Sequence, residues 1–150
     1  IRRKYNTLVS MQTAEEIKIR LGSAHPSAPA TGACLFPGLN LANHLPCKIS
    51  LTQEEVRIAL DSQLTQIIDA VADMIPTLGT ALVQDLKKTG ITLCGGVASM
   101  PGLPERIYSW TNSKVFVPKT PRLAVARGLA AALDHFDELH PLLECPEDRI

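Results

Sequence analysis

The sequence predicts an α/β fold, and three features of its 150 residues support that prediction. A short apolar strand at 91–94 ends in a glycine pair, and a second strand at 114–117 follows after a helical stretch. Apolar residues recurring every three or four positions predict further helices on both sides of this unit. A strand–helix–strand unit of this kind forms a parallel, right-handed crossover, and ligands in such sheets bind beyond the carboxyl ends of the strands.

The composition argues against several classes of function. Fifteen Lys and Arg balance fifteen Asp and Glu, which argues against binding to nucleic acid or a membrane surface through bulk charge. No apolar run approaches the length of a membrane span. Because the chain starts at Ile1 with residues typical of the middle of a helix, we expect it to be part of a longer protein. The dispersed cysteines predict reduced thiols in the cytoplasm and no metal site; they are Cys34, Cys47, Cys94 and Cys145.

The first stretch predicts two helices. Residues 1–10 are typical of the end of a helix, and residues 13–16 form a capping-box pattern that would open a second helix, ending near Gly22. Glu15 and Lys18 lie one turn apart on that helix. From spacing alone they form a solvated ion pair worth a few tenths of a kcal/mol, roughly 0.2–0.5.

A β-hairpin and two helices are predicted next. Strands at 34–36 and 47–51 are separated by turn residues, including those at 37–40, and a disulfide between the two hairpin cysteines is an alternative to free thiols. A second capping box opens a long helix to about residue 75, and a shorter helix follows at 78–88. The buried face of the long helix should consist of the apolar stripe Val56, Leu60, Leu64, Ile67, Val71 and Met74.

The glycine pair after the strand at 91–94 is the candidate ligand site. Gly95 and Gly96 let the chain turn sharply, so its backbone N–H groups can approach a sugar or a phosphate. A tight structural turn is the alternative. The spacing matches neither the dinucleotide-binding glycine fingerprint nor a P-loop.

The C-terminal part predicts a helix packed on the sheet. Pro121 stands at a tolerated first helical position, and the small apolar stretch 123–133 should be tightly buried. Tyr108 and Trp110 should be packing residues. The charged tail 137–150 should be loosely held.

Several runs together resemble the MreB family of bacterial actin-like rod-shape proteins. They are Lys4-Tyr5-Asn6, Thr13-Ala14-Glu15-Glu16-Ile17-Lys18 and Leu21-Gly22-Ser23-Ala24-His25-Pro26. Leu93-Cys94-Gly95-Gly96 with Pro101-Gly102-Leu103 resembles the adenosine motif of the actin/Hsp70/sugar-kinase superfamily, and Thr120-Pro121 with Ala126-Arg127-Gly128 fits the helix that closes the same lobe. The resemblance covers roughly residues 1–136, with the segment 27–33 divergent.

The resemblance implies a partial actin-like (ribonuclease H-like) ATPase lobe. Residues 1–26 would be helices entering subdomain IIB, and residues 27–90 would be the rest of that subdomain. Residues 91–136 would form the C-terminal part of subdomain IIA with the adenosine motif, followed by the tail.

The resemblance also implies a nucleoside site. The positions that match the adenine and ribose contacts of the superfamily are Glu15, Lys18, Gly95, Gly96, Val97, Ala98 and Ser99. Val97 stands where the family usually has a third glycine, and its branched side chain should lower affinity if it faces the nucleotide. Cys94 replaces a usual threonine. The two phosphate loops and the catalytic carboxylate are not in this chain, so Mg²⁺ would be held elsewhere and this part alone should not hydrolyse ATP.

By resemblance, the function is that of an ATP-dependent filament protein that maintains cell shape. The implied partners are other copies of the protein and a membrane-anchored cell-shape and peptidoglycan-synthesis complex, with no nucleic acid. The implied location is the cytoplasm, at the membrane as a filament. The alternatives are a degenerate lobe that serves only as an interaction or structural module, and an actin-like chaperone or plasmid-segregation ATPase, which would lack the run at 13–18.

Overall fold

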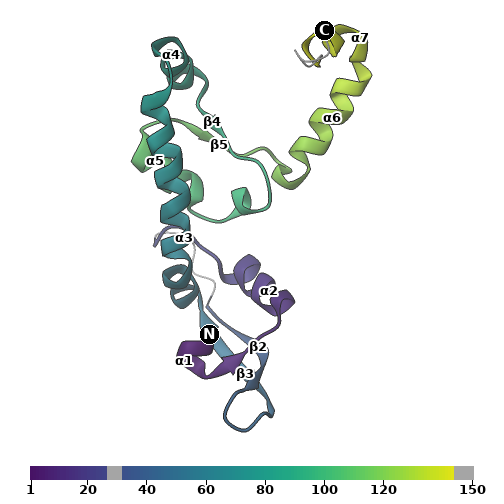
Figure 1. The fold of residues 1–150 in the computed structure, drawn as a ribbon. Helices are drawn as coiled ribbons and strands as arrows, with labels where there is room; N and C mark the ends of the chain where they lie inside the picture. The colour runs from purple at the N-terminus through teal and green to yellow at the C-terminus, as the bar shows by residue number, and fades with distance from the viewer. Residues whose placement is uncertain (27–31, 144–150) are drawn as a thin grey trace, which may run out of the picture.

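The longest helix of the protein connects two small sheets, as Figure 1 shows. The computed structural model describes residues 1–26 and 32–143, with side chains described as far as residue 140. One sheet is antiparallel with the strand order β1-β2-β3, and the other is a parallel pair, β4-β5. The divergent segment predicted at 27–33 and the end of the tail fall largely outside the described residues.

The elements follow the chain in this order: α1 (Arg2–Tyr5), β1 (Thr7–Leu8), α2 (Met11–Leu21), β2 (Ala33–Asn40), β3 (Pro46–Thr52), α3 (Gln53–Met74), the 3-10 turn η1 (Ile75–Thr77), α4 (Thr80–Thr89), β4 (Ile91–Thr92), η2 (Val97–Ser99), α5 (Leu103–Thr111), β5 (Val115–Phe116), η3 (Pro121–Leu123), α6 (Ala124–Asp134) and α7 (Phe136–Leu143).

The predicted start of the chain was wrong in two respects. The first helix ends at Tyr5, Asn6 turns the chain with a φ of 47°, and Thr7 enters the sheet opposite Asn40. Thr7 is 2% exposed, so a tertiary contact outweighs local helical preference there. Helix α2 begins at Met11 rather than after Thr13, because the Ser10 hydroxyl caps it and accepts from the Thr13 N–H at 3.0 Å.

The hairpin was predicted correctly, but β2 is longer than expected. It continues through the predicted turn at 37–40. Glycine at position 38 permits the close approach of Thr7 from β1, because a Cβ at Gly38 would stand only 2.4 Å from Cγ2 of Thr7. In the observed register, Cys34 lies opposite Leu51 and Cys47 lies opposite Gly38. The two cysteines are therefore not cross-strand neighbours, and both are free thiols.

Helix α3 has the predicted capping box, in which Thr52 and Glu55 bond each other's backbone N–H groups. Its buried face differs from the predicted stripe. Ile68 is fully buried, whereas Ile67 is 48% exposed and Met74 is 55% exposed. The residues of α3 that contact the cores recur at every fourth position. The C-terminal end of the helix extends beyond both cores.

Two separate hydrophobic cores flank α3. The first comprises Ile17, Leu21, Phe36, Ile49, Leu51 and Val56. The second comprises Ala24, Leu64, Ile68, Met100, Leu103 and Ile107. Leu60 of α3 is partly buried and packs against both. Helix α3 therefore forms a common spine for two packing units.

The parallel pairing of the C-terminal strands is confirmed. Ile91 lies opposite Val115 and Thr92 opposite Phe116. The Leu93 N–H extends the pairing by donating to the Phe116 carbonyl at 2.8 Å. Strand β4 itself ends at Thr92, two residues before the predicted end at residue 94, and the chain then continues to the glycine pair.

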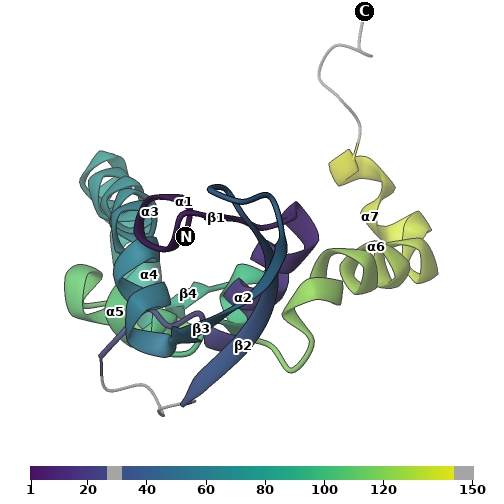
Figure 2. The same cartoon turned by 90° about the horizontal axis from the view of Figure 1, so that it is seen from below.

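The predicted burial of the last helix was wrong. Val125, Leu129 and Leu133 of α6 are 69%, 63% and 71% exposed. Both views show α6 and α7 extending away from the rest of the molecule (Figure 1, Figure 2). The two-stranded sheet does not extend to α6. The apolar face of α6 therefore has no surface to pack on among the described residues.

The expected packing of Tyr108 and Trp110 was wrong, because their side chains are 51% and 57% exposed. The predicted tail begins in α7, which includes Asp137. Within the described part of the chain, no helix combines the length and apolar character needed to cross a membrane.

Candidate functional site

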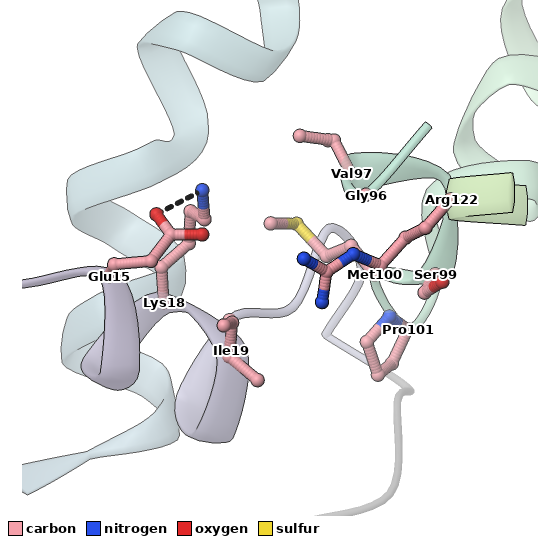
Figure 3. Close-up of a pocket in the computed structure, with 10 residues that line it drawn as sticks. Glu15, Lys18, Ile19, Gly96, Val97, Ser99, Met100, Pro101 and Arg122 are labelled. Atoms are coloured by element: carbon pink, nitrogen blue, oxygen red, sulfur yellow. Dashed lines mark ion pairs between the residues drawn. The ribbon is translucent and has the colours of Figure 1, made fainter. Parts of the chain in front are cut away.

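A cleft of about 360 Å³ lies between α2 and the turn that follows β4 (Figure 3). Its lining comes from segments far apart in the sequence: Glu15, Lys18, Ile19 and Gly22 from α2 and its end, Gly96, Val97, Ser99, Met100 and Pro101 from the glycine turn, and Arg122 from η3. The fold thus brings the two predicted halves of the nucleoside site to one cavity.

The α2 wall carries an ion pair. The Lys18 Nζ lies 2.6 Å from Oε2 of Glu15, one helical turn apart, as the sequence predicted. The Lys18 side chain is 34% exposed and that of Glu15 is 55% exposed, so the pair itself adds little stability. The ammonium has three N–H donors, which leaves Lys18 capacity for a ligand in the cleft.

The glycine turn forms the opposite wall. Gly95 has a φ of +91°, a backbone conformation that favours glycine. Its N–H donates to the Pro121 carbonyl at 2.8 Å, and Ala98 is buried beneath the turn. Gly95 and Ala98 therefore support the wall without lining the cleft, whereas Gly96 and Ser99 line it.

Val97, which replaces the usual family glycine, lines the cleft and is 41% exposed. Its side chain extends from the glycine turn toward the α2 side of the cavity (Figure 3). The two walls approach closely at Gly22, where a Cβ would stand 3.2 Å from Cε of Met100. The cleft is therefore narrow at this end.

Sequence reasoning missed five lining residues, Ile19, Gly22, Met100, Pro101 and Arg122, and Arg122 is the most consequential. Its guanidinium reaches into the cleft, and its Cγ lies 3.9 Å from the position of a Cβ on Gly96 (Figure 3). Among residues 1–26 and 32–140, no carboxylate forms an ion pair with it. One signal was available: Arg122 follows β5 as Gly96 follows β4, and the carboxyl ends of parallel strands share one sheet edge.

The charges of the lining favour an anionic ligand. One carboxylate, Glu15, faces two cationic groups, Lys18 and Arg122, so the cleft carries one net positive charge. In the described part of the chain, no three His, Cys, Asp or Glu side chains lie together as a metal site requires.

Solved structures that share this fold include two of one MreB protein. MreB5 of Spiroplasma citri bound to AMPPNP superposes with a TM-score of 0.85, at 22% identity, over 92% of this chain and 41% of that chain. The same protein bound to ADP superposes with a TM-score of 0.86, at 22% identity, over 96% of this chain and 43% of that chain. The protein is therefore part of an actin-like α/β lobe, as the sequence predicted.

Sequence comparison identifies the family. The sequence profile of the MreB/Mbl protein family matches residues 1–141. Cell shape-determining protein MreB of Escherichia coli (strain K12) is 34% identical over 137 residues, which is 91% of this chain and 39% of that protein. Cell shape-determining protein Mbl of Bacillus subtilis (strain 168) is 29% identical over 139 residues, which is 93% of this chain and 41% of that protein. The chain belongs to the MreB/Mbl family of actin-like, cell shape-determining proteins, and it spans about two-fifths of the length of these relatives.

Proposed function

We propose that this chain is the nucleoside-binding lobe of an ATP-dependent, actin-like filament protein that maintains bacterial cell shape. The observation that carries the proposal is the cleft itself. It places Glu15 and Lys18 opposite Gly96 and Ser99, although the two pairs come from distant parts of the sequence. These are positions that resemblance to the superfamily assigns to adenine and ribose.

The cleft fits a nucleoside in size and chemistry. Its volume of about 360 Å³ falls within the range of small-molecule pockets, about 300–1,000 Å³. The Glu15 carboxylate can accept from ribose hydroxyls or an exocyclic amine, and the Lys18 ammonium can donate. Ile19 and Met100 offer apolar surface to a planar base. The net positive charge suits a ligand that carries phosphates.

In this proposal the chain binds and orients the nucleoside half only. The bound nucleotide supplies a phosphoanhydride bond whose cleavage would be coupled to filament state. The loops that hold the phosphates and Mg²⁺ belong to the part of the family's fold that this chain does not span. Self-association into filaments, attachment to a membrane-anchored peptidoglycan-synthesis complex and a cytoplasmic location follow from the same proposal. The solved relative was crystallised with AMPPNP and with ADP, which supports nucleotide as the ligand class.

One observation favours a second function. Val97 is stiff, branched and turned into the cleft, where it narrows the space for a ligand. A lobe whose cleft no longer admits nucleotide would serve as an interaction or structural module.

Nucleotide binding decides between these functions. A fluorescent ATP analogue is titrated into the full-length protein, into Lys18→Ala and into Gly96→Val, and we expect each variant to lose at least about ten-fold in affinity, about 1.4 kcal/mol. Gly96 has a φ of −66°, so valine is compatible with the backbone and acts by entering the cleft.

Matched controls are available in α4 and at Gly79, the residue that precedes it. Lys87→Ala removes another lysine, and Gly79→Val adds the same side chain where a Cβ meets nothing within 4 Å. Both should bind as the unmodified protein does. Equal affinity in all five proteins would overturn the assigned site, and an absence of binding in the unmodified protein would favour the interaction module.

A further inference from the structure

The two walls of the cleft belong to different hydrophobic cores. Helix α2 contributes Ile17 and Leu21 to the first core, whereas Met100 and Leu103, on either side of Pro101 and Gly102, belong to the second. The width of the cleft therefore depends on what holds one packing unit against the other.

One arginine joins the segments that carry both walls to the common spine. Arg106 lies on α5, which begins directly after the glycine-turn wall. Its Nη1 donates to Oδ1 of Asp61 at 2.8 Å, and its Nη2 donates to Oγ1 of Thr65 at 2.8 Å, both on α3. The same Nη1 donates to the Ala24 carbonyl at 3.3 Å, in the segment that follows α2.

A second hydrogen bond connects Ala24 to a residue that lines the cleft. The Ala24 N–H donates to the Pro101 carbonyl at 2.8 Å, and Ala24 is 1% exposed. Ala24 follows the last lining residue of the α2 side, Gly22, and Pro101 lines the other side. Close packing accompanies this bond: Gly102 has a φ of +80°, and a Cβ there would stand 2.6 Å from Cβ of His25. The segment that follows α2 and the glycine turn are thus joined by a backbone hydrogen bond, and Arg106 holds this junction against α3.

We infer that Arg106 is a positioning residue for the cleft, and this inference rests on the proposed function of nucleotide binding. Arg106 does not line the cavity. It fixes the end of α2 and the glycine turn at one distance from α3, because a planar guanidinium can donate to three acceptors in a fixed geometry. Its side chain is 14% exposed and that of Asp61 is 49% exposed, so water has little access to the guanidinium side of these bonds. A ligand that touches both walls requires this spacing.

The test compares Arg106 with a matched arginine. Arg57 also lies on the lobe, pairs with Glu54 through two hydrogen bonds and has a side chain 19% exposed, but it does not connect the two walls. We expect Arg106→Met to weaken binding of the fluorescent ATP analogue at least ten-fold, about 1.4 kcal/mol, in full-length protein whose circular dichroism is unchanged. We expect Arg57→Met to change it less than two-fold. Arg106→Lys should weaken binding by an intermediate amount, since lysine keeps the positive charge but lacks the planar guanidinium that donates to several acceptors.

A double-mutant cycle separates positioning from loss of folded protein. If Arg106 sets the wall spacing, the effect of Lys18→Ala on affinity shrinks in the Arg106→Met background. A reduced folded fraction would instead lower affinity by the same factor in both backgrounds. Thr65→Val removes the bond from Arg106 and the bond that the Thr65 hydroxyl donates to the Asp61 carbonyl, without removing a charge. It should weaken binding in the same direction, so the inference remains testable if Arg106→Met does not fold.

The outcomes are distinguishable. Binding by the unmodified protein together with equal affinity in Arg106→Met and Thr65→Val, or an additive cycle, overturns the positioning role and leaves the proposed function standing. An unmodified protein that binds no analogue overturns the proposed function and the inference with it.

Discussion

The N–H of Gly95 donates to the carbonyl of Pro121 at 2.8 Å, and this bond holds the glycine turn beside the segment that carries Arg122. The Arg122 guanidinium consequently reaches the same cleft as Gly96. A cation that no described carboxylate neutralises is a candidate partner for the ligand. Its position results from tertiary contacts between the ends of two parallel strands.

Replacing Arg122 should weaken nucleotide binding. We expect Arg122→Leu to reduce affinity for a fluorescent ATP analogue about ten-fold, or about 1.4 kcal/mol, because an unpaired charge in the cleft is lost. Arg122→Lys should lose less, since it retains the charge. Arg127→Leu on the exposed part of α6 is the control. A loss of equal size in the control would assign the effect to overall charge rather than to the cleft.

Restoring the usual family glycine should strengthen binding. In Val97→Gly the branched side chain no longer occupies the cleft, so we expect affinity for the same analogue to rise several-fold. The backbone becomes more flexible, which costs about 0.5–1 kcal/mol of stability and can be checked by urea unfolding. Tighter binding with slightly lower stability is the expected pair of results. Weaker binding would show that Val97 contacts the ligand favourably.

Two neighbouring isoleucines test which face of α3 is buried. Ile68 is 0% exposed and Ile67 is 48% exposed. We expect Ile68→Ala to lower the free energy of unfolding by about 2–5 kcal/mol, because it leaves a cavity in the second core. Ile67→Ala should cost less than about 1 kcal/mol. Urea unfolding of both variants measures the difference, and equal costs would contradict the observed rotation of the helix.

Glu55 should make the lobe sensitive to acid. Hydrogen bonds from Lys4, then Tyr5, then Thr52 hold the pKa of Glu55 far below its ordinary value. A carboxyl group with a lower pKa in the folded state stabilises the fold above its unfolded pKa of about 4.3. That stabilisation is lost as pH falls through this value toward the folded pKa.

The measurement is the free energy of unfolding between pH 7 and pH 3. The unmodified protein should lose stability toward the acid end, and Glu55→Gln should lose less, starting from a lower value at pH 7. Glu105→Gln, at the exposed start of α5, should follow the unmodified protein. Parallel curves for Glu55→Gln and the unmodified protein would contradict a role for this carboxylate.

The local features of the fold were predictable because they depend on neighbouring residues. Thr52 and Glu55 form a capping box from residues three apart, and Glu15 and Lys18 pair across one helical turn. Gly95 and Gly96 follow a short strand, and Gly95 has the positive φ that favours glycine. The alternation of strand, helix and strand likewise predicted the parallel pairing.

Features that depend on distant packing were not predictable. Thr7 leaves the helical pattern because β2 offers it a partner strand, and Ile68 rather than Ile67 is buried because of where the second core lies. The apolar face of α6 looks like a core helix from composition, yet the described part of the chain places no surface against it. Composition states what a helix could bury, and only the neighbouring elements decide whether it does.

By itself the sequence determined the fold class, the order of the elements apart from β1 and α7, the glycine turn and the pairing of Glu15 with Lys18, since short-range geometry and hydrophobic periodicity specify these. The tertiary structure alone decided that Arg122 enters the cleft and that Arg106 ties its walls to α3. The physical reason is that contacts between residues distant in the sequence set both positions: Gly95 with Pro121 for Arg122, and Arg106 with Asp61. Hydrogen-bond and charge contacts of that range exist only after the two cores have packed on the shared helix.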